Sequence, residues 1–83
     1  MKRTLDSDES KVLGDWLRAK RKEKGLTMRD LALKINSSHT FVSKVENQER
    51  RLDVLEFISY CQSLELDPTE SFKEVAELVS NNG

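Results

Sequence analysis

The polar side chains with the most suggestive spacing lie between residues 38 and 47 of this 83-residue chain. In the segment SHTFVSKVEN, the apolar Val42 and Val45 stand three positions apart, which predicts a short helix with one buried face. The opposite face then carries small or basic side chains that can donate hydrogen bonds, namely His39, Thr40, Ser43 and Lys44. We expect such a face to bind a surface rich in hydrogen-bond acceptors.

Residue groups that commonly carry catalysis are not found. The chain has one Cys, Cys61, and one His, His39, and the two do not stand at a recognisable catalytic spacing. With no second His and no second Cys, they do not form a metal-binding cluster. It contains no Ser–His–Asp grouping at recognisable spacing and no glycine-rich phosphate loop. The sequence therefore predicts a protein that is not an enzyme and holds no metal or cofactor. Cys61 is expected to be a small buried hydrophobe.

Charge is divided unevenly along the chain, although the formal net charge is only −1. Residues 18–51 hold ten Lys or Arg against four acidic residues, a balance of +6. Residues 52–83 hold one Lys against seven acidic residues, a balance of −6. This segregation suits a module that turns one face toward phosphate. The alternative, a surface that is charged only to stay solvated, does not predict it.

Length and composition favour one domain in the cytoplasm. Eighty-three residues suffice for a single domain, and one Cys excludes an internal disulfide. No apolar run approaches the roughly 20 residues that span a bilayer. The first ten residues, MKRTLDSDES, lack the apolar core of a signal peptide.

Apolar spacing and capping signals predict five helices joined by short turns. The expected ranges are about 10–24, 27–36, 38–47, 53–64 and 68–79, after a flexible polar arm at 1–9. The helix starts are marked by residues that cap a helix or suit its first turn: Thr27, Ser37 or Ser38, Asp53 with Glu56, and Asp67 with Pro68. The predicted buried positions of the fourth helix are Leu55, Phe57, Ile58, Cys61 and Leu64.

The second and third helices are too short to be stable alone, so packing must hold them in place. Ala32 allows close approach of a neighbouring helix, and the break at Asn36-Ser37-Ser38 forces the third helix to cross the second steeply. A helix with the third one's donors suits the major groove of DNA, where base edges offer acceptors. Four basic residues flank it in sequence and could meet phosphates: Arg29, Lys34, Arg50 and Arg51.

Taken together, these features make the stretch TMRDLALKINSSHTFVSKVENQERRLD resemble the helix-turn-helix of the phage repressor and Cro group, the Xre family. The resemblance runs from about Val12 to Phe72. It is carried by the KGLT entry, the Leu31-Ala32 pair, three apolar positions (Ile35, Val42 and Val45) and the Glu46-Asn47 ending. It implies an all-α, five-helix, lambda repressor-like DNA-binding domain over residues 10–83, with the helix-turn-helix at about 27–47. At this length the chain looks similar to stand-alone regulators such as restriction–modification controller proteins.

The resemblance also implies roles for individual positions. Ser38 matches the residue that caps the recognition helix and often touches the DNA backbone, and Asn47 matches a phosphate contact. Arg21 and Glu46 match a partly buried ion pair. The positions that usually read bases are His39, Thr40, Ser43 and Lys44, and the proposed backbone contacts are Arg29, Ser38, Asn47, Arg50 and Arg51. Phe41 is left open between core packing and contact with a thymine methyl.

Three residues depart from the family pattern. Met28 stands where Gln commonly contacts a phosphate, so that contact does not carry over. Asn36 and Gln48 replace glycines that are common at the two turns. Asn36 tolerates the turn conformation, whereas Gln48 suggests a different exit loop.

The last helix carries more apolar residues than one buried face needs: Phe72, Val75, Ala76, Leu78 and Val79. This excess suggests a two-fold homodimer with Val75, Leu78 and Val79 in the contact; the alternative is a frayed tail on a monomer. A dimer would place two recognition helices in successive major grooves about 34 Å apart, on a near-palindromic operator.

The sequence leaves two functions open. The leading one is a sequence-specific regulator of transcription that binds double-stranded DNA, controls its own gene and, as the resemblance implies, is bacterial or phage-encoded. The other is a protein-interaction module, such as an antitoxin of a toxin–antitoxin pair whose acidic end covers a basic partner. A toxin or the transcription machinery would then be the protein partner.

Overall fold

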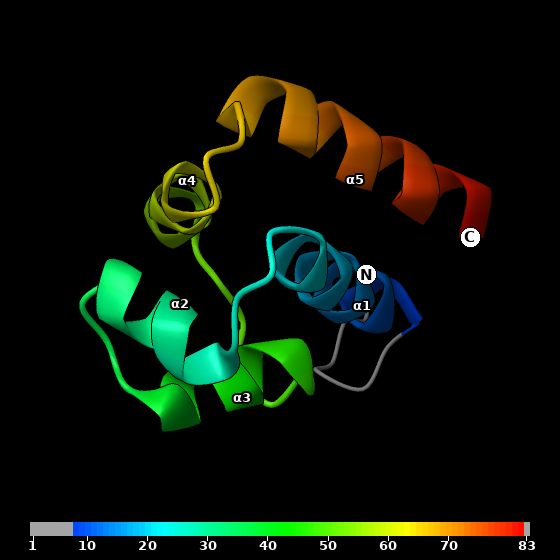
Figure 1. Cartoon of the computed structure of the whole chain (residues 1–83). Helices are drawn as coiled ribbons and strands as arrows, with labels where there is room; N and C mark the ends of the chain where they lie inside the picture. The colour runs from blue at the N-terminus through cyan, green and yellow to red at the C-terminus, as the bar shows by residue number, and fades with distance from the viewer. Residues whose placement is uncertain (1–7, 83) are drawn as a thin grey trace.

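The computed structural model describes residues 8–82, and within that range the chain folds into five α-helices and no strand (Figure 1). The helices are α1 (Asp8–Glu23), α2 (Met28–Lys34), α3 (His39–Glu46), α4 (Val54–Ser63) and α5 (Pro68–Asn82). The all-α, five-helix prediction is therefore confirmed. Two of the predicted helices are longer than expected, because α1 begins at Asp8 rather than Ser10 and α5 continues past residue 79. The remainder of the predicted arm, residues 1–7, lies outside the described range.

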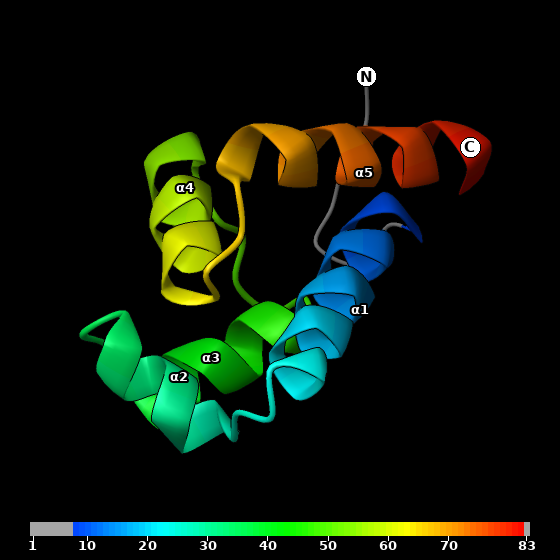
Figure 2. The same cartoon turned by 45° about the horizontal axis from the view of Figure 1, so that its top comes forward.

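Helix α1 lies between the α2–α3 pair and α5. Figures 1 and 2 both show α2 and α3 on one side of α1 and α5 on the other, and α1 packs against both α3 and α5. The basic segment 18–51 contains α2 and α3, whereas the acidic segment 52–83 contains α4 and α5. The segregation in space is partial, because five of the ten basic residues lie between positions 18 and 24, at the end of α1. One of them, Lys20, pairs with Glu74 of α5 at 3.5 Å. No helix in the described range has the length and apolar content needed to cross a membrane.

Helices α2, α3 and α4 each begin directly after a predicted capping residue. The Thr27 hydroxyl accepts a hydrogen bond from the Asp30 amide at 3.0 Å, and the Asp30 carboxylate accepts one from the Thr27 amide at 2.9 Å. Asp53 and Glu56 form the same reciprocal capping box at 2.7 and 2.9 Å. Ser38 caps α3 through its side chain. These bonds satisfy amide groups that a helix start otherwise leaves unpaired.

Left-handed backbone conformations end three of the helices without glycine. Asn36 has φ +56°, Gln48 has φ +65° and Glu65 has φ +61°. Asn36 occupies the turn between α2 and α3, as its tolerance of this conformation predicts. Gln48, expected to alter the exit loop, adopts a conformation that favours glycine.

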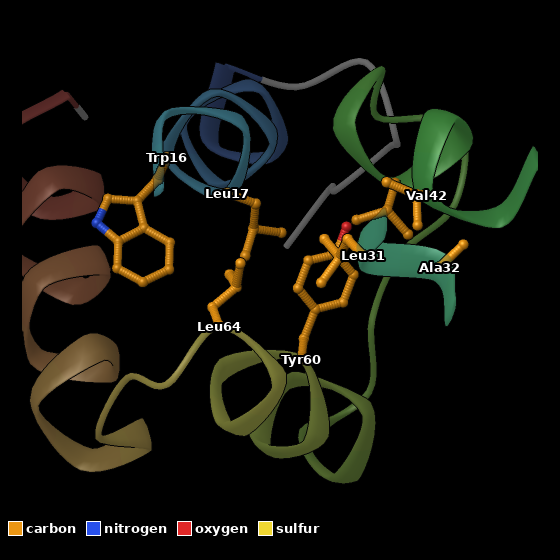
Figure 3. Close-up of a cluster of buried hydrophobic side chains, with 8 residues drawn as sticks. Trp16, Leu17, Leu31, Ala32, Val42, Tyr60 and Leu64 are labelled. Atoms are coloured by element: carbon orange, nitrogen blue, oxygen red, sulfur yellow. The ribbon is translucent and has the colours of Figure 1, made fainter. Parts of the chain in front are cut away.

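The core lies where α1, α2, α3 and α4 meet (Figure 3). Its buried hydrophobic residues are Trp16, Leu17, Leu31, Ala32, Val42, Val45, Tyr60 and Leu64. Cys61 is fully buried, as predicted. The prediction for Leu55 is wrong, because this side chain is 77% exposed. At roughly 100° per residue, Leu55 is about 140° around α4 from Tyr60, the residue that instead enters the core.

Gly14 sets the distance between α1 and the end of α3. A Cβ atom at this position would lie 2.6 Å from the backbone carbonyl oxygen of Glu46 and 3.1 Å from Cγ of Gln48. Only a residue without a side chain allows this approach. It places Arg18 and Arg21, one and two turns further along α1, within reach of the last turn of α3.

We expect Gly14→Ala to destabilise the domain by about 1–3 kcal/mol, because α1 and α3 must separate to admit the methyl group. The free energy of unfolding can be measured by urea denaturation followed by circular dichroism. Lys22→Ala, at an exposed position of α1, is the matched control and should change stability by less than about 0.5 kcal/mol. Alanine is intrinsically the better helix former, so a Gly14→Ala variant more stable than the wild type would contradict the close approach.

Candidate nucleic-acid interface

Helix α3 divides into a buried and an open face as the sequence predicts. Val42 is 0% exposed and Val45 is 4% exposed, and both pack in the core. On the opposite side lie the four predicted base-contacting residues, His39, Thr40, Ser43 and Lys44, which we call the polar face of α3. Ser43 is half-buried and the other three are exposed. The valines therefore fix the helix to the body while its hydrogen-bonding side chains stay accessible.

The start of α3 is fixed by Ser38. Its hydroxyl oxygen accepts a hydrogen bond from the Phe41 amide at 3.0 Å, as expected for an N-cap. The preceding turn is closed by the Ser37 amide, which donates to the Ala32 carbonyl at 2.9 Å. Both bonds hold the exposed first turn of α3, with His39 and Thr40, at a fixed position relative to α2.

The predicted ion pair between Arg21 and Glu46 is present and is more deeply buried than expected. Arg21 Nε and Nη2 donate to the two carboxylate oxygens of Glu46 at 2.6 and 3.1 Å. Arg21 Nη1 also donates to the Leu26 carbonyl at 2.8 Å. Arg21 is 6% exposed and Glu46 is 0% exposed. The hydrogen bond to Glu46 raises the pKa of Arg21, and the pair joins α1 to the last turn of α3.

Tyr60 makes the surroundings of this ion pair strongly desolvated. Its side chain extends from α4 toward Leu31 (Figure 3), and its hydroxyl is buried with no hydrogen-bond partner among the described residues. Burial raises the pKa of Tyr60, and the negative charge of Glu46 raises it further. Because water has so little access here, the guanidinium and carboxylate depend on each other for solvation.

Sequence reasoning missed Arg18, which lies between the ion pair and the polar face of α3. Its Nη2 donates to Asn47 Oδ1 at 3.0 Å, and its Nε lies 3.4 Å from Glu46 Oε1. Asn47 Nδ2 in turn donates to Ser43 Oγ at 3.3 Å. Arg18 stands three positions before Arg21, and such residues share one face of a helix. That spacing was the signal that could have found it.

Arg50, predicted to contact phosphate, makes several contacts within the chain. Its guanidinium donates to the Glu56 carboxylate at 2.6 and 3.3 Å and to the Arg51 carbonyl. It also lies over the Phe41 ring, 5.1 Å from the centroid. Two hydrogen bonds lower the pKa of Glu56, of which the one from the Asp53 amide has the larger effect and the one from Arg50 the smaller. Phe41 is partly buried against the core, so Arg50 links α3 to α4.

Three other predicted backbone contacts lie on exposed surface around α3. Arg29 projects from α2, and Asn47 and Arg51 lie in the segment that follows α3. Within the described range, the guanidinium groups of Arg29 and Arg51 have no hydrogen-bond or ion-pair partner. Free cationic groups before and after a hydrogen-bonding helix can neutralise an extended anion on both sides of it.

A family model described as helix-turn-helix, HTH_3, matches residues 17–71. The matched range includes all of α2, α3 and α4. The chain therefore belongs to the Xre/Cro-like helix-turn-helix family, whose members are DNA-binding regulators of transcription. This confirms the resemblance on which the site prediction was based.

Several solved structures share this fold. An XRE-family like protein from Pseudomonas syringae is 36% identical, with a TM-score of 0.77 over 84% of this chain and 85% of that one. The clp gene regulator ClgR from Corynebacterium glutamicum is 25% identical, with a TM-score of 0.78 over 93% and 82%. The restriction–modification controller protein C.Esp1396I, as a tetramer with its natural 35-base-pair operator, is 26% identical, with a TM-score of 0.79 over 89% and 97%. No curated protein sequence matches the chain.

Replacement of Arg21 by Met is expected to destabilise the domain by about 3–5 kcal/mol, because Glu46 is left buried without its counter-charge. In a domain of this size, such a loss is a large share of the total free energy of unfolding. The thermal unfolding midpoint measured by circular dichroism would show it.

A double variant distinguishes the cost of leaving Glu46 buried without a partner from the net contribution of the ion pair to the free energy of unfolding. In Arg21→Met with Glu46→Leu, no charge is left buried, so we expect most of the lost stability to return. A single Arg21→Met variant that unfolds within a few degrees of the wild type, or a double variant no more stable than the single one, would contradict this account.

Proposed function

We propose that this chain is a homodimeric, sequence-specific regulator that binds a near-palindromic operator in double-stranded DNA and controls its own gene. The observation that carries the proposal is the division of α3. Two buried valines anchor the helix, and the polar face of α3 stays accessible between free cationic groups. This arrangement suits a helix lying in a major groove, with base edges in front of it and phosphates on both sides.

The individual roles follow from chemistry and position. Base contacts are proposed for His39, Thr40, Ser43 and Lys44, because each of these side chains can donate a hydrogen bond to the acceptors of the major groove. Phosphate contacts are proposed for Arg29, Ser38, Asn47, Arg50 and Arg51. Arg50 has a second role in this proposal, because its contacts with Phe41 and Glu56 also hold α3 against α4.

The charge distribution supports one orientation on DNA. The basic segment 18–51 includes α2 and α3, and the acidic segment 52–83 includes α4 and α5, of which α5 lies across α1 from α2 and α3 (Figure 1). A polyanion attracts the first group and repels the second. Among the solved relatives, ClgR is a gene regulator and C.Esp1396I binds its operator as a tetramer. Both are consistent with a regulator that binds through α3.

The dimer proposal is supported by apolar surface on α4 and α5. Phe72 is 63% exposed and Leu78 is 44% exposed, while Val75 and Val79 are half-buried. A hollow of about 240 Å³ beside Phe72 and Val75 is lined mainly by apolar side chains. A second copy of the chain that covered this surface would remove it from water. An isologous contact of this kind produces a two-fold axis and, with it, two matching half-sites.

Controlled substitutions should separate base reading from phosphate binding. Lys44→Ala is expected to change the order of preference among operator variants, whereas Arg51→Ala should weaken binding to all of them alike. Binding of the wild type should weaken steeply as salt rises, because lysines and arginines displace counterions, and Arg51→Ala should reduce the slope by about 1. Fluorescence anisotropy on a panel of duplexes, starting with the DNA upstream of the gene itself, measures both effects.

The base-reading role of Lys44 would be refuted if both variants lost the same factor on every duplex. A wild type with no preference over random duplex would refute the proposed function itself. That result would favour the alternative function, a protein-interaction module.

For the dimer, Leu78→Glu is expected to shift the chain from dimer to monomer, because it places a charge in an apolar contact. Sedimentation velocity at several concentrations measures the change. Leu33→Glu is the matched control: Leu33 is 81% exposed on α2, far along the chain from α5, and the variant should remain dimeric. A wild type that is monomeric at all concentrations would contradict the proposed dimer.

A further inference from the structure

A hydrogen-bond relay connects the ion pair to the polar face of α3. The relay consists of Arg18, Asn47 and Ser43. Arg18 Nη2 donates to Asn47 Oδ1 at 3.0 Å, and Asn47 Nδ2 donates to Ser43 Oγ at 3.3 Å. Arg18 is itself oriented by Glu46, whose Oε1 lies 3.4 Å from its Nε. The relay thus runs from a carboxylate in the core to a side chain that faces outward.

Chemistry fixes the direction of each step. A guanidinium has five N–H donors and no acceptor, so the Asn47 amide must turn its oxygen toward Arg18. The amide nitrogen then faces Ser43, and an NH₂ group can only donate. The Ser43 oxygen is therefore the acceptor in this bond. The other hydrogen of the Asn47 NH₂ stays available for a phosphate, so the proposed phosphate contact and the relay are compatible.

The relay leaves the Ser43 hydroxyl with a hydrogen to give. Among the described residues, Ser43 has no acceptor for its own O–H. An isolated serine can rotate to donate or to accept, and it distinguishes bases poorly for that reason. Here Asn47 engages one of the two lone pairs of the Ser43 oxygen, on the side turned toward α1, so the hydroxyl keeps its hydrogen and one lone pair for a ligand over the polar face of α3. Because an oxygen that already accepts a hydrogen bond donates its own hydrogen more strongly, the relay favours donation.

We propose that the Arg18–Asn47–Ser43 relay favours the Ser43 hydroxyl as a hydrogen-bond donor, and that Ser43 thereby prefers an operator base that presents an acceptor. This inference rests on the proposed function. In the major groove, guanine presents only acceptors, at N7 and O6, whereas cytosine presents only a donor, at N4. Ser43 is therefore expected to prefer guanine over cytosine as the base that faces it. Arg18 is a positioning residue that touches no base.

A reversal of the relay provides the test. A carboxylate at position 47 keeps a favourable partner in Arg18 but cannot donate to Ser43. In Asn47→Asp, the Ser43 hydroxyl donates to the carboxylate, and its oxygen is left as an acceptor for the base. The preference at the base facing Ser43 should then change from guanine to cytosine.

The experiment measures dissociation constants for duplexes in which each operator position is varied in turn. The position read by Ser43 is the one whose preference disappears in Ser43→Ala. There the wild type should favour guanine over cytosine by roughly three- to tenfold, Asn47→Asp should favour cytosine, and Asn47→Ala should show a reduced preference. Because the added charge of Asn47→Asp weakens all duplexes alike, only the ratio at this position is informative.

Ser37→Asp is the matched control, since it adds the same charge to an exposed turn beside α3 without touching the relay. It should lower every affinity and leave the guanine-to-cytosine ratio unchanged. The relay proposal is overturned if Asn47→Asp, shown to be folded by circular dichroism, keeps the wild-type preference, or if Ser43→Ala alters no position. A wild type that binds all duplexes equally overturns instead the proposed function on which the relay depends.

Discussion

The buried contact of Arg21 with Glu46 is the interaction on which the rest of the structure depends. Both carboxylate oxygens are bound by one guanidinium, at 2.6 and 3.1 Å. Nearby lies the buried Tyr60 hydroxyl, which has no hydrogen-bond partner within residues 8–82. Charges in such surroundings are tolerated only as a pair. The geometry that brings them together depends on Gly14, where even a methyl group would clash with the Glu46 backbone. One glycine and one ion pair therefore fix the end of α3 on α1.

This arrangement connects core packing with the surface that we propose meets DNA. Glu46, the last residue of α3, is bound by Arg21 on its buried side and lies beside Arg18 toward the surface. Arg18 holds Asn47, and Asn47 holds Ser43. A helix of only eight residues, such as α3, would not be stable alone. Its two ends are fixed instead, by the Ser38 cap at the start and by this network at the finish.

Much of the fold could be predicted from the sequence because its signals are local. Capping residues such as Thr27, Ser38 and Asp53 satisfy amides within a few positions of themselves, and apolar spacing reports which face of a helix is buried. The exposure of His39, Thr40 and Lys44 follows from the burial of Val42 and Val45 on the other face of the same helix. The ion pair of Arg21 with Glu46 was predicted from the family resemblance, since its partners lie 25 positions apart.

The features that sequence reasoning missed are those set by tertiary contact. Leu55 has the same apolar chemistry as its neighbours, and only the way in which α4 packs against the shared core decides that Tyr60 is buried in its place. Gly14 looks like a weak point in a helix until the carbonyl of Glu46 is placed against it. Arg50 looked like a free phosphate contact, but Glu56 and Phe41 lie close enough to engage it. Contacts between segments far apart in sequence leave little trace in local patterns.

The central claim is that α3 presents its polar face to a duplex while α4 and α5 stay turned away. An NMR titration of the isotopically labelled chain with operator and with random duplex tests this directly. We predict that amide shifts caused by the operator concentrate in residues 28–51, and that random duplex perturbs the cationic flanks but not the amides of His39 to Lys44. Operator-induced shifts concentrated in α4 and α5, with those of α3 unchanged, would contradict it.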